Sequence, residues 1–176
     1  MITDLLGTFE QLVVARNPLL AKKLKPGLSE EQIRRLLRRH RVDGDLAQVV
    51  ALYRWKNGTK LDPEIVASKV GFFPGKAYYF LDLEMALGHL DHTKVAARKR
   101  PQLADGAFYF PLFWDGSTGW IATDIRPSHH NAVIAAEHRA EVPFREAYAS
   151  LYEFLEDAIR ALTTNEGMRP NSGTLT

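Results

Sequence analysis

The chain has 176 residues, a formal net charge of +2 and no cysteine, with 45% hydrophobic and 25% charged residues. Its length suits one globular domain, and the lack of cysteine excludes disulfides, thiolate metal ligands and a cysteine nucleophile. No uncharged stretch approaches a membrane span, and Asp4 and Glu10 interrupt any leader-like start, so we expect a soluble cytoplasmic protein without a membrane partner.

Helices are predicted for the first part of the chain. The elements are a helix over 2–15, a proline-containing connector over 17–27, a helix that begins at Ser29 and a helix over 46–55. Ser29 can accept a hydrogen bond from the first turn of its helix, and Gln32 completes the spacing of a capping box. We expect Asp45 to cap the following helix and Asn57-Gly58 to end it.

The middle of the chain changes to strand-like segments. The elements are short strands over 71–73 and 77–81 around Pro74-Gly75, a helix over 83–90 capped by Asp82, a basic loop over 94–101, a hairpin with arms 107–113 and 120–125, and a strand over 132–136. A long helix is predicted over 144–162, and a polar tail follows Thr163.

This order of elements predicts an α+β protein. We expect a single, mostly antiparallel β-sheet with N-terminal and C-terminal helices packed on it. Residues 1–27 would form an N-terminal helix and connector, residues 28–163 the domain proper, and residues 164–176 a flexible tail.

Several short motifs, taken in order, resemble the SMI1/KNR4 family, also called the SUKH superfamily. They are Ser29 to Gln32 at a helix start, Asn57-Gly58 after a helix, Phe72 to Gly75, the helix entry Leu81 to Ala86, Phe110-Pro111-Leu112 with Asp115-Gly116, Asp124 at a strand end, and Phe154-Leu155 in a closing helix. The resemblance covers about residues 28–162. It departs from the family at Gly44-Asp45-Leu46, where Leu-Pro is usual, and at Gly119, where an acidic residue often ends the hairpin turn.

The resemblance implies a binding scaffold of SMI1/KNR4-like fold and brings no shared catalytic residues. Many bacterial members are immunity proteins that neutralise a cognate toxin, often a nuclease, and fungal members act in cell-wall regulation. We therefore expect a protein partner, with a toxin as the sharper hypothesis, and neither a catalytic site nor a cofactor. A fold-level likeness does not by itself establish a function.

Aromatic and acidic residues suggest where a partner would bind. Trp114 and Trp120 bracket the Asp115-Gly116 turn, and large rigid side chains at such a margin are typical interface anchors. The segment from Glu137 to Asp157 is acid-rich, which would suit a basic partner or equally form a solvated helix face. The predicted partner-binding residues are Trp114, Asp115, Trp120, Asp124, Glu153 and Asp157.

Histidines offer the main alternative, a small enzyme. A pocket near His129 and His130, with Asp124, would be its hallmark. His89 and His92 have helical spacing for two metal ligands, but no third ligand is evident, so we predict no metal site.

A second alternative is a polyanion-binding module that uses the arginines from Arg34 to Arg41. The net charge is too small to argue for nucleic acid by itself. Glu30 and Glu31 each precede an arginine by four residues, a spacing that stabilises a helix without any ligand. We therefore rank nucleic acid and small-molecule substrates below a protein partner.

Overall fold

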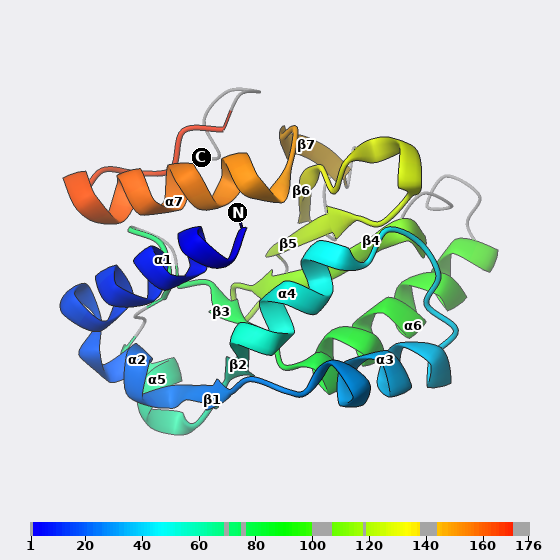
Figure 1. Ribbon diagram of the computed structural model, residues 1–176, viewed down its shortest axis with the longest axis horizontal. Coiled ribbons are helices and arrows are strands. Elements are labelled where there is room, and N and C mark those ends of the chain that lie inside the picture. The colour runs from blue at the N-terminus through cyan, green and yellow to red at the C-terminus, as the bar shows by residue number, and fades with distance from the viewer. Residues whose placement is uncertain are drawn as a thin grey trace.

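The computed structural model describes residues 2–68, 71–74, 77–99, 107–117, 119–137 and 144–170. In chain order the elements are α1 (Ile2–Arg16), α2 (Pro18–Lys23), β1 (Leu24–Pro26), α3 (Glu30–Arg39), α4 (Ala47–Trp55), β2 (Lys56–Thr59), α5 (Pro63–Ser68), β3 (Tyr79–Phe80), α6 (Leu83–Lys99), β4 (Tyr109–Trp114), β5 (Gly119–Asp124), β6 (Val133–Glu137), β7 (Phe144–Tyr148) and α7 (Leu151–Thr164) (Figure 1). A single turn of 3₁₀-helix, Pro127–His129, lies between β5 and β6.

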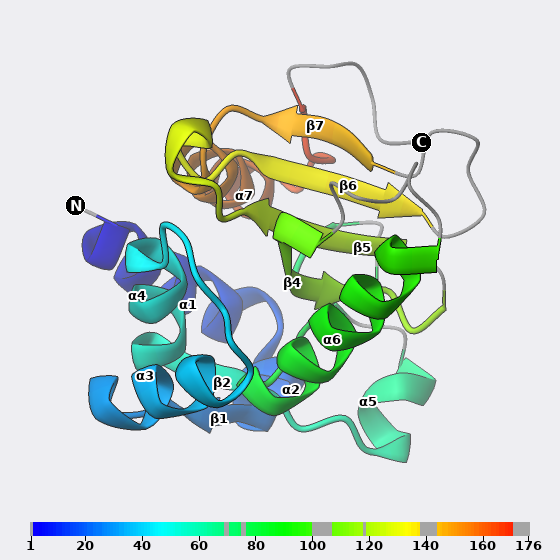
Figure 2. The ribbon, with the colours of Figure 1, turned by 90° about the vertical axis from the view of Figure 1, so that its right-hand side faces the viewer.

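The main sheet has the strand order β3-β4-β5-β6-β7, and every neighbouring pair is antiparallel. Figure 2 shows α6 in front of this sheet and α7 behind it. Because β5 is the central strand and is covered on both sides, its four consecutive residues from Ile121 to Asp124 are all buried. The α+β prediction, with helices packed on an antiparallel sheet, is confirmed.

A second, two-stranded sheet replaces the predicted connector over 17–27. Pro18 begins α2, where a missing N–H costs nothing, and β1 then pairs antiparallel with β2. Asn57-Gly58 does not form the left-handed end of α4, because α4 ends at an extended Lys56 and the pair lies inside β2. Instead, Asn57 Oδ1 accepts a hydrogen bond from the Leu83 amide at 3.0 Å, which caps the start of α6.

Three further boundaries differ from the prediction. The segment 71–73 is not a strand, since only Phe73 forms an isolated bridge, and the turn residue Gly75 lies outside the described residues. α6 continues to Lys99, so the predicted helix end at Leu90 and the loop from 94 to 99 are wrong. The predicted helix over 144–162 is two elements, β7 and α7, because Phe144–Tyr148 pairs with β6.

The capping predictions are confirmed at two helices. Ser29 accepts from the Gln32 amide at 3.2 Å, and Gln32 Oε1 accepts from the Ser29 amide at 2.9 Å, which completes the capping box of α3. Asp82 Oδ1 accepts from the Met85 amide at 2.8 Å at the start of α6. At α4, Leu46 occupies the cap position, and Asp45 Oδ1 accepts only a long bond, 3.4 Å, from the Ala47 amide.

One core joins both ends of the chain to the sheet. Leu6, Phe9 and Val13 of α1 are buried, and α1 packs along α7. Phe72 lies at the centre of a ring cluster, with centroids 5.8 Å from Phe9, 6.3 Å from Phe73, 6.5 Å from Phe80 and 5.6 Å from Phe113. The segment 2–16 therefore belongs to the same core as the sheet.

The end of α3 has a backbone conformation that favours glycine. Arg41 has φ of +51°, its amide donates to Arg38 O at 3.0 Å, and the Val42 amide donates to Leu37 O at 3.0 Å. These two bonds are those of a Schellman motif, with Arg41 at the left-handed position. A non-glycine residue there costs about 1 kcal/mol or more.

We expect Tyr53→Phe to stabilise the protein. Tyr53 is fully buried, and the described residues offer its hydroxyl no hydrogen-bond partner, a state that costs about 1–3 kcal/mol. Burial first, and the Asp82 charge second, raise the pKa of Tyr53 well above its ordinary value. The unfolded chain would lose this proton near pH 10 while the native state keeps it, so native stability falls as the pH rises above about 10.

Urea unfolding of both proteins at pH 7 and across the range above pH 9 measures the two effects. The Tyr53→Phe variant should unfold at higher urea at pH 7, and its stability should fall less steeply in alkali. A loss of stability at pH 7 would contradict the assignment of an unsatisfied hydroxyl.

Candidate functional site

Two tryptophans from the β4–β5 hairpin form a stacked, partly buried pair. Trp114 lies opposite Trp120 in the strand register, and their ring centroids are 5.8 Å apart with planes 21° from parallel. His89 of α6 meets Trp120 edge-on, with centroids 4.2 Å apart. All three side chains are only partly buried. We call Trp114, Trp120 and His89 the aromatic patch.

The hairpin turn holds one of these tryptophans in place. Trp114 Nε1 donates to Ser117 O at 3.1 Å. Asp115 Oδ1 accepts from the Ser117 amide at 2.8 Å and the Gly119 amide at 3.0 Å. A Cβ at Gly119 would lie 2.4 Å from Asp115 Oδ2, so a larger residue there would displace the Asp115 carboxylate. Asp115 therefore fastens the turn that carries the patch.

The predicted binding residues lie on opposite faces of the sheet. Phe113 contacts Phe154 of α7, with centroids 5.8 Å apart, whereas its neighbour Trp114 faces His89 of α6. Successive side chains of a strand point to opposite faces, so the tryptophans are on the α6 side. Glu153 and Asp157 belong to α7 on the other side. The structure thus brings Trp114, Asp115 and Trp120 together and leaves the α7 acids apart from them.

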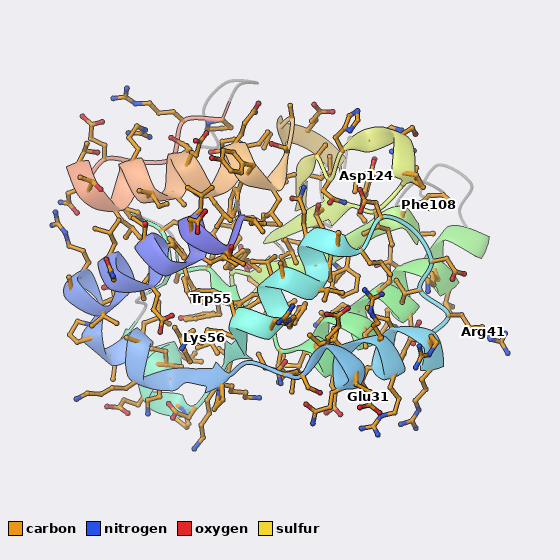
Figure 3. The ribbon with its side chains drawn as sticks, viewed as in Figure 1. Glu31, Arg41, Trp55, Lys56, Phe108 and Asp124 are labelled. Carbon is orange, nitrogen blue, oxygen red and sulfur yellow. The ribbon has the colours of Figure 1, made fainter. Side chains whose placement is uncertain are left out.

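Asp124 is placed in the interior, with 2% of its side chain exposed. It accepts from the Arg126 amide and from the Arg126 guanidinium, each through Oδ1 at 3.0 Å, and its Oδ2 lies 3.1 Å from His129 Nδ1. The guanidinium in turn covers the rings of Phe108 and Tyr109, at 5.7 and 5.6 Å from their centroids. Figure 3 labels Asp124 and Phe108 at this end of the sheet. Asp124 is therefore paired internally and is not an exposed recognition carboxylate.

The same end of the sheet is tied to the helices by Asn131. Its backbone φ is +55°, and its side-chain Nδ2 donates to Asp45 O at 3.0 Å and Asp124 O at 3.2 Å. The Thr123 hydroxyl donates to Asn131 O at 3.1 Å. These bonds join the β5–β6 connection to the segment before α4. Asp124 and Asn131 therefore have a structural role at this end of the sheet.

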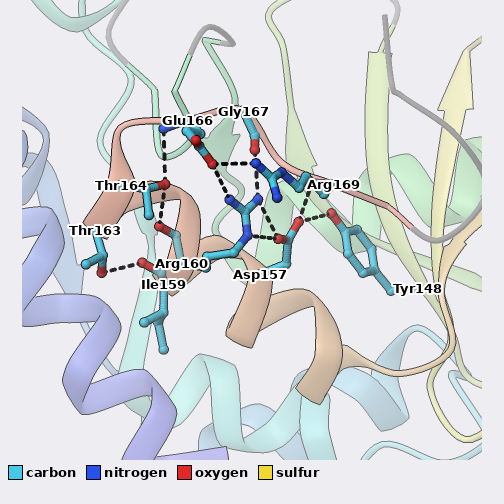
Figure 4. A network of polar contacts seen from close by, with 9 residues as sticks. All are labelled: Tyr148, Asp157, Ile159, Arg160, Thr163, Thr164, Glu166, Gly167 and Arg169. Atoms are coloured by element: carbon cyan, nitrogen blue, oxygen red, sulfur yellow. Dashed lines mark hydrogen bonds and ion pairs between the residues drawn. The ribbon is translucent and has the colours of Figure 1, made fainter.

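Asp157 is the centre of a polar network at the end of the chain (Figure 4). Its Oδ2 accepts from the Tyr148 hydroxyl at 2.7 Å and the Arg169 amide at 2.6 Å, and its Oδ1 accepts from Arg160 Nε at 2.7 Å. Burial, together with the bond to Asp157, raises the pKa of Tyr148 far above its ordinary value. This network holds residues as far as Arg169 against α7; residues 171–176 lie outside the described residues.

Glu153 is exposed but is also engaged locally. Its Oε2 accepts from the Ala149 amide at 3.2 Å, while Ser150 Oγ accepts from the Glu153 amide at 3.2 Å. The bond to Ser150 caps α7, and the bond to Ala149 ties Glu153 to the residue before the cap. Glu153 and Asp157, the two predicted binding residues of α7, therefore each have a bonding role within or beside their own helix.

The contact between Asp124 and His129 is the feature that an enzyme would use. A buried carboxylate can orient a histidine as a general base. Here the charge of Asp124 is offset by Arg126, and no hydroxyl of a described residue is hydrogen-bonded to His129. His130 is exposed and has φ of +50°. Among the described residues, no group of three or more metal-binding side chains could hold a metal ion.

His89 is the patch residue that the sequence prediction missed. The predicted helix end at Leu90 placed His89 at a C-terminus, but α6 continues well beyond it. In a longer helix, Met85, His89 and His92 share one face at spacings of four and three residues, and that spacing was the available signal.

The chain matches no protein family model, and a comparison with curated proteins finds no similar sequence. In the described part of the chain, none of the helices combines the length and the hydrophobicity that crossing a membrane requires.

Proposed function

We propose that this chain is a protein-binding module of the SMI1/KNR4 type and that the aromatic patch is its contact surface. The observation that carries the proposal is the stacked Trp114–Trp120 pair, partly exposed and fastened by the Asp115 turn and by His89. Tryptophans are over-represented among the residues that dominate binding energy, and a pre-formed surface loses little conformational entropy on association.

The sharper proposal for the partner is a toxin, with this chain as its immunity protein. Such an inhibitor needs no chemistry, because covering or distorting the active site of the toxin is sufficient. The aromatic patch favours recognition by shape and apolar contact. Electrostatic attraction to a basic nuclease has less support, since Asp115, Asp124 and Asp157 each have partners within the chain.

Co-purification with the product of a neighbouring toxin gene, made catalytically inactive, tests the proposal. Calorimetry should give a complex that Trp114→Ala weakens by about 30-fold or more, the effect of losing an interface anchor. Ser117→Arg, which adds bulk beside Trp114 at an exposed position, should weaken the complex similarly.

Tyr152→Ala is the matched control. Tyr152 is an exposed aromatic, 41% accessible, on α7 at the opposite face of the sheet. It should leave the affinity unchanged. Loss of binding in the Tyr152 variant, with full binding by the Trp114 and Ser117 variants, would refute the aromatic patch as the interface. Thermal unfolding of each variant separates lost contacts from lost folding.

A further inference from the structure

The arginines of α3 form one continuous exposed surface. Arg34, Arg35, Arg38 and Arg39 are all exposed, whereas Ile33 and Leu37 are buried. At 100° per residue the four arginines cover an arc of roughly 140° opposite the buried pair. With Arg41 beyond the helix end, they make what we call the arginine face.

Most of these charges have no neutralising carboxylate among the residues that the structure describes. Glu30 lies 2.7 Å from Arg34 and 3.5 Å from Arg54, so it serves two arginines. Within the described part of the chain, Arg35, Arg38, Arg39 and Arg41 have no carboxylate partner. Residues 30–41 contain five arginines and two glutamates, a net charge of +3, while the whole chain carries +2. The remainder of the chain therefore sums to −1, although residues 94–100 form a second basic segment.

The backbone at Arg41 independently points to a role for its side chain. Arg41 occupies the left-handed position of the Schellman motif, where glycine would relieve strain. In Figure 3 its side chain projects away from the ribbon. An arginine in this position is disfavoured for folding, so its presence is consistent with a use for the guanidinium.

The arginine face is also held rigidly. His40 Nδ1 lies 2.6 Å from Asp91 Oδ2 of α6. Lys94 Nζ donates to His40 O at 3.2 Å and to Arg41 O at 3.4 Å. These contacts fix the C-terminal end of α3 against α6 and leave the arginines projecting outward.

We propose that the arginine face binds the phosphate backbone of a DNA duplex, as a second activity independent of the aromatic patch. Guanidiniums bind phosphate through paired hydrogen bonds, and the face contains no lysine. α3 contains no aromatic residue on which the bases of a single strand could stack. The apolar side of α3 is buried, so no apolar side chains are available to insert into a lipid bilayer. An exposed helix suits the wide major groove of B-DNA rather than the narrow groove of RNA.

Fluorescence anisotropy with a labelled DNA duplex of roughly 24 base pairs tests this proposal. The four arginines that have no carboxylate partner among the described residues predict a log–log salt slope of about −3.6, so the affinity should fall roughly 150-fold between about 50 and 200 mM salt. Arg35→Gln with Arg39→Gln should reduce the slope to about −1.8. Lys22→Gln with Lys60→Gln, the same charge change at exposed lysines outside α3, should leave the slope near the wild-type value.

Arg41→Gly separates binding from folding. It should raise the melting temperature by removing the strained conformation, yet weaken duplex binding and reduce the slope by about 0.9. No duplex binding at low salt, an equal loss in the lysine control, or tighter binding to an RNA duplex or to phosphatidylserine vesicles would each overturn the assignment. None of these results depends on the aromatic patch, so the two proposals stand or fall separately.

Discussion

Gly58→Ala should destabilise the protein by roughly 2–5 kcal/mol, the combined cost of a left-handed alanine and a backbone collision. Gly58 has φ of +77°, and a Cβ on it would lie 2.2 Å from the Asp82 amide nitrogen and 2.5 Å from Leu81 C. Both atoms are backbone, so no side-chain rotation relieves the contact. The substitution would force β2 away from the start of α6, where Asn57 provides a cap. Urea unfolding at pH 7 gives the change in the free energy of unfolding.

Gly88→Ala provides the matched control for this prediction. Gly88 is exposed within α6, and nothing lies within 4 Å of a Cβ built on it. Alanine there should stabilise the protein by about 1 kcal/mol, the difference in helix propensity. The same chemical change is thus expected to have opposite signs at the two glycines. If both substitutions changed the free energy of unfolding equally, the collision with the Asp82 backbone would not explain the effect at Gly58.

Phe72→Ala should lower the free energy of unfolding by about 3–5 kcal/mol, because it removes a fully buried ring from the centre of the core. Phe72 contacts rings from α1, from β3 and from β4, so the cavity would be bounded by three separate elements. Those elements are held by the sheet and by α7, which limits how far they can collapse into the space. Thermal or urea unfolding measures the loss.

Phe108→Ala is the corresponding control at the surface. Phe108 is 45% exposed, and the Arg126 guanidinium lies over its ring at the end of the sheet. Replacing Phe108 with alanine should lower the free energy of unfolding by about 1 kcal/mol or less. A loss at Phe108 as large as that at Phe72 would contradict the placement of the core around the Phe72 cluster.

The elements with strong local signals were predictable from the sequence. The capping box at Ser29 and Gln32 marks the start of α3, and the Asp115-Gly116 turn between two apolar arms marks the β4–β5 hairpin. In both cases the signal is a hydrogen-bonding or turn preference that acts within a few residues, so no tertiary information was required.

The boundaries that depend on tertiary pairing were not predictable in the same way. Residues 144–148 include Arg145, Glu146 and Ala147, which favour helix, but pairing with β6 makes them a strand. The start of α7 did carry a local signal, since Ser150 and Glu153 have capping-box spacing. The end of α6 lacked a breaker before Pro101, and the helix runs on to Lys99.

Of the predicted binding residues, only those of the β4–β5 hairpin could be placed together from the sequence. Trp114, Asp115 and Trp120 are neighbours through the hairpin, which local pairing determines. His89 joins them only because α6 crosses that face of the sheet, and Asp157 is excluded because α7 lies on the other face. Acidic composition in the sequence could not reveal that Asp124 and Asp157 are occupied by Arg126 and Arg160.

The packing of α1 along α7 has a consequence for how the chain folds as it is synthesised. Arg16 Nη2 donates to Thr163 O, a contact across 147 positions of sequence. Loop closure over such a separation is slow, and α1 leaves the ribosome long before its partner exists. The side of α1 that packs on α7 therefore stays uncovered until α7 has been synthesised, whereas its contacts with α2 and α4 can form earlier.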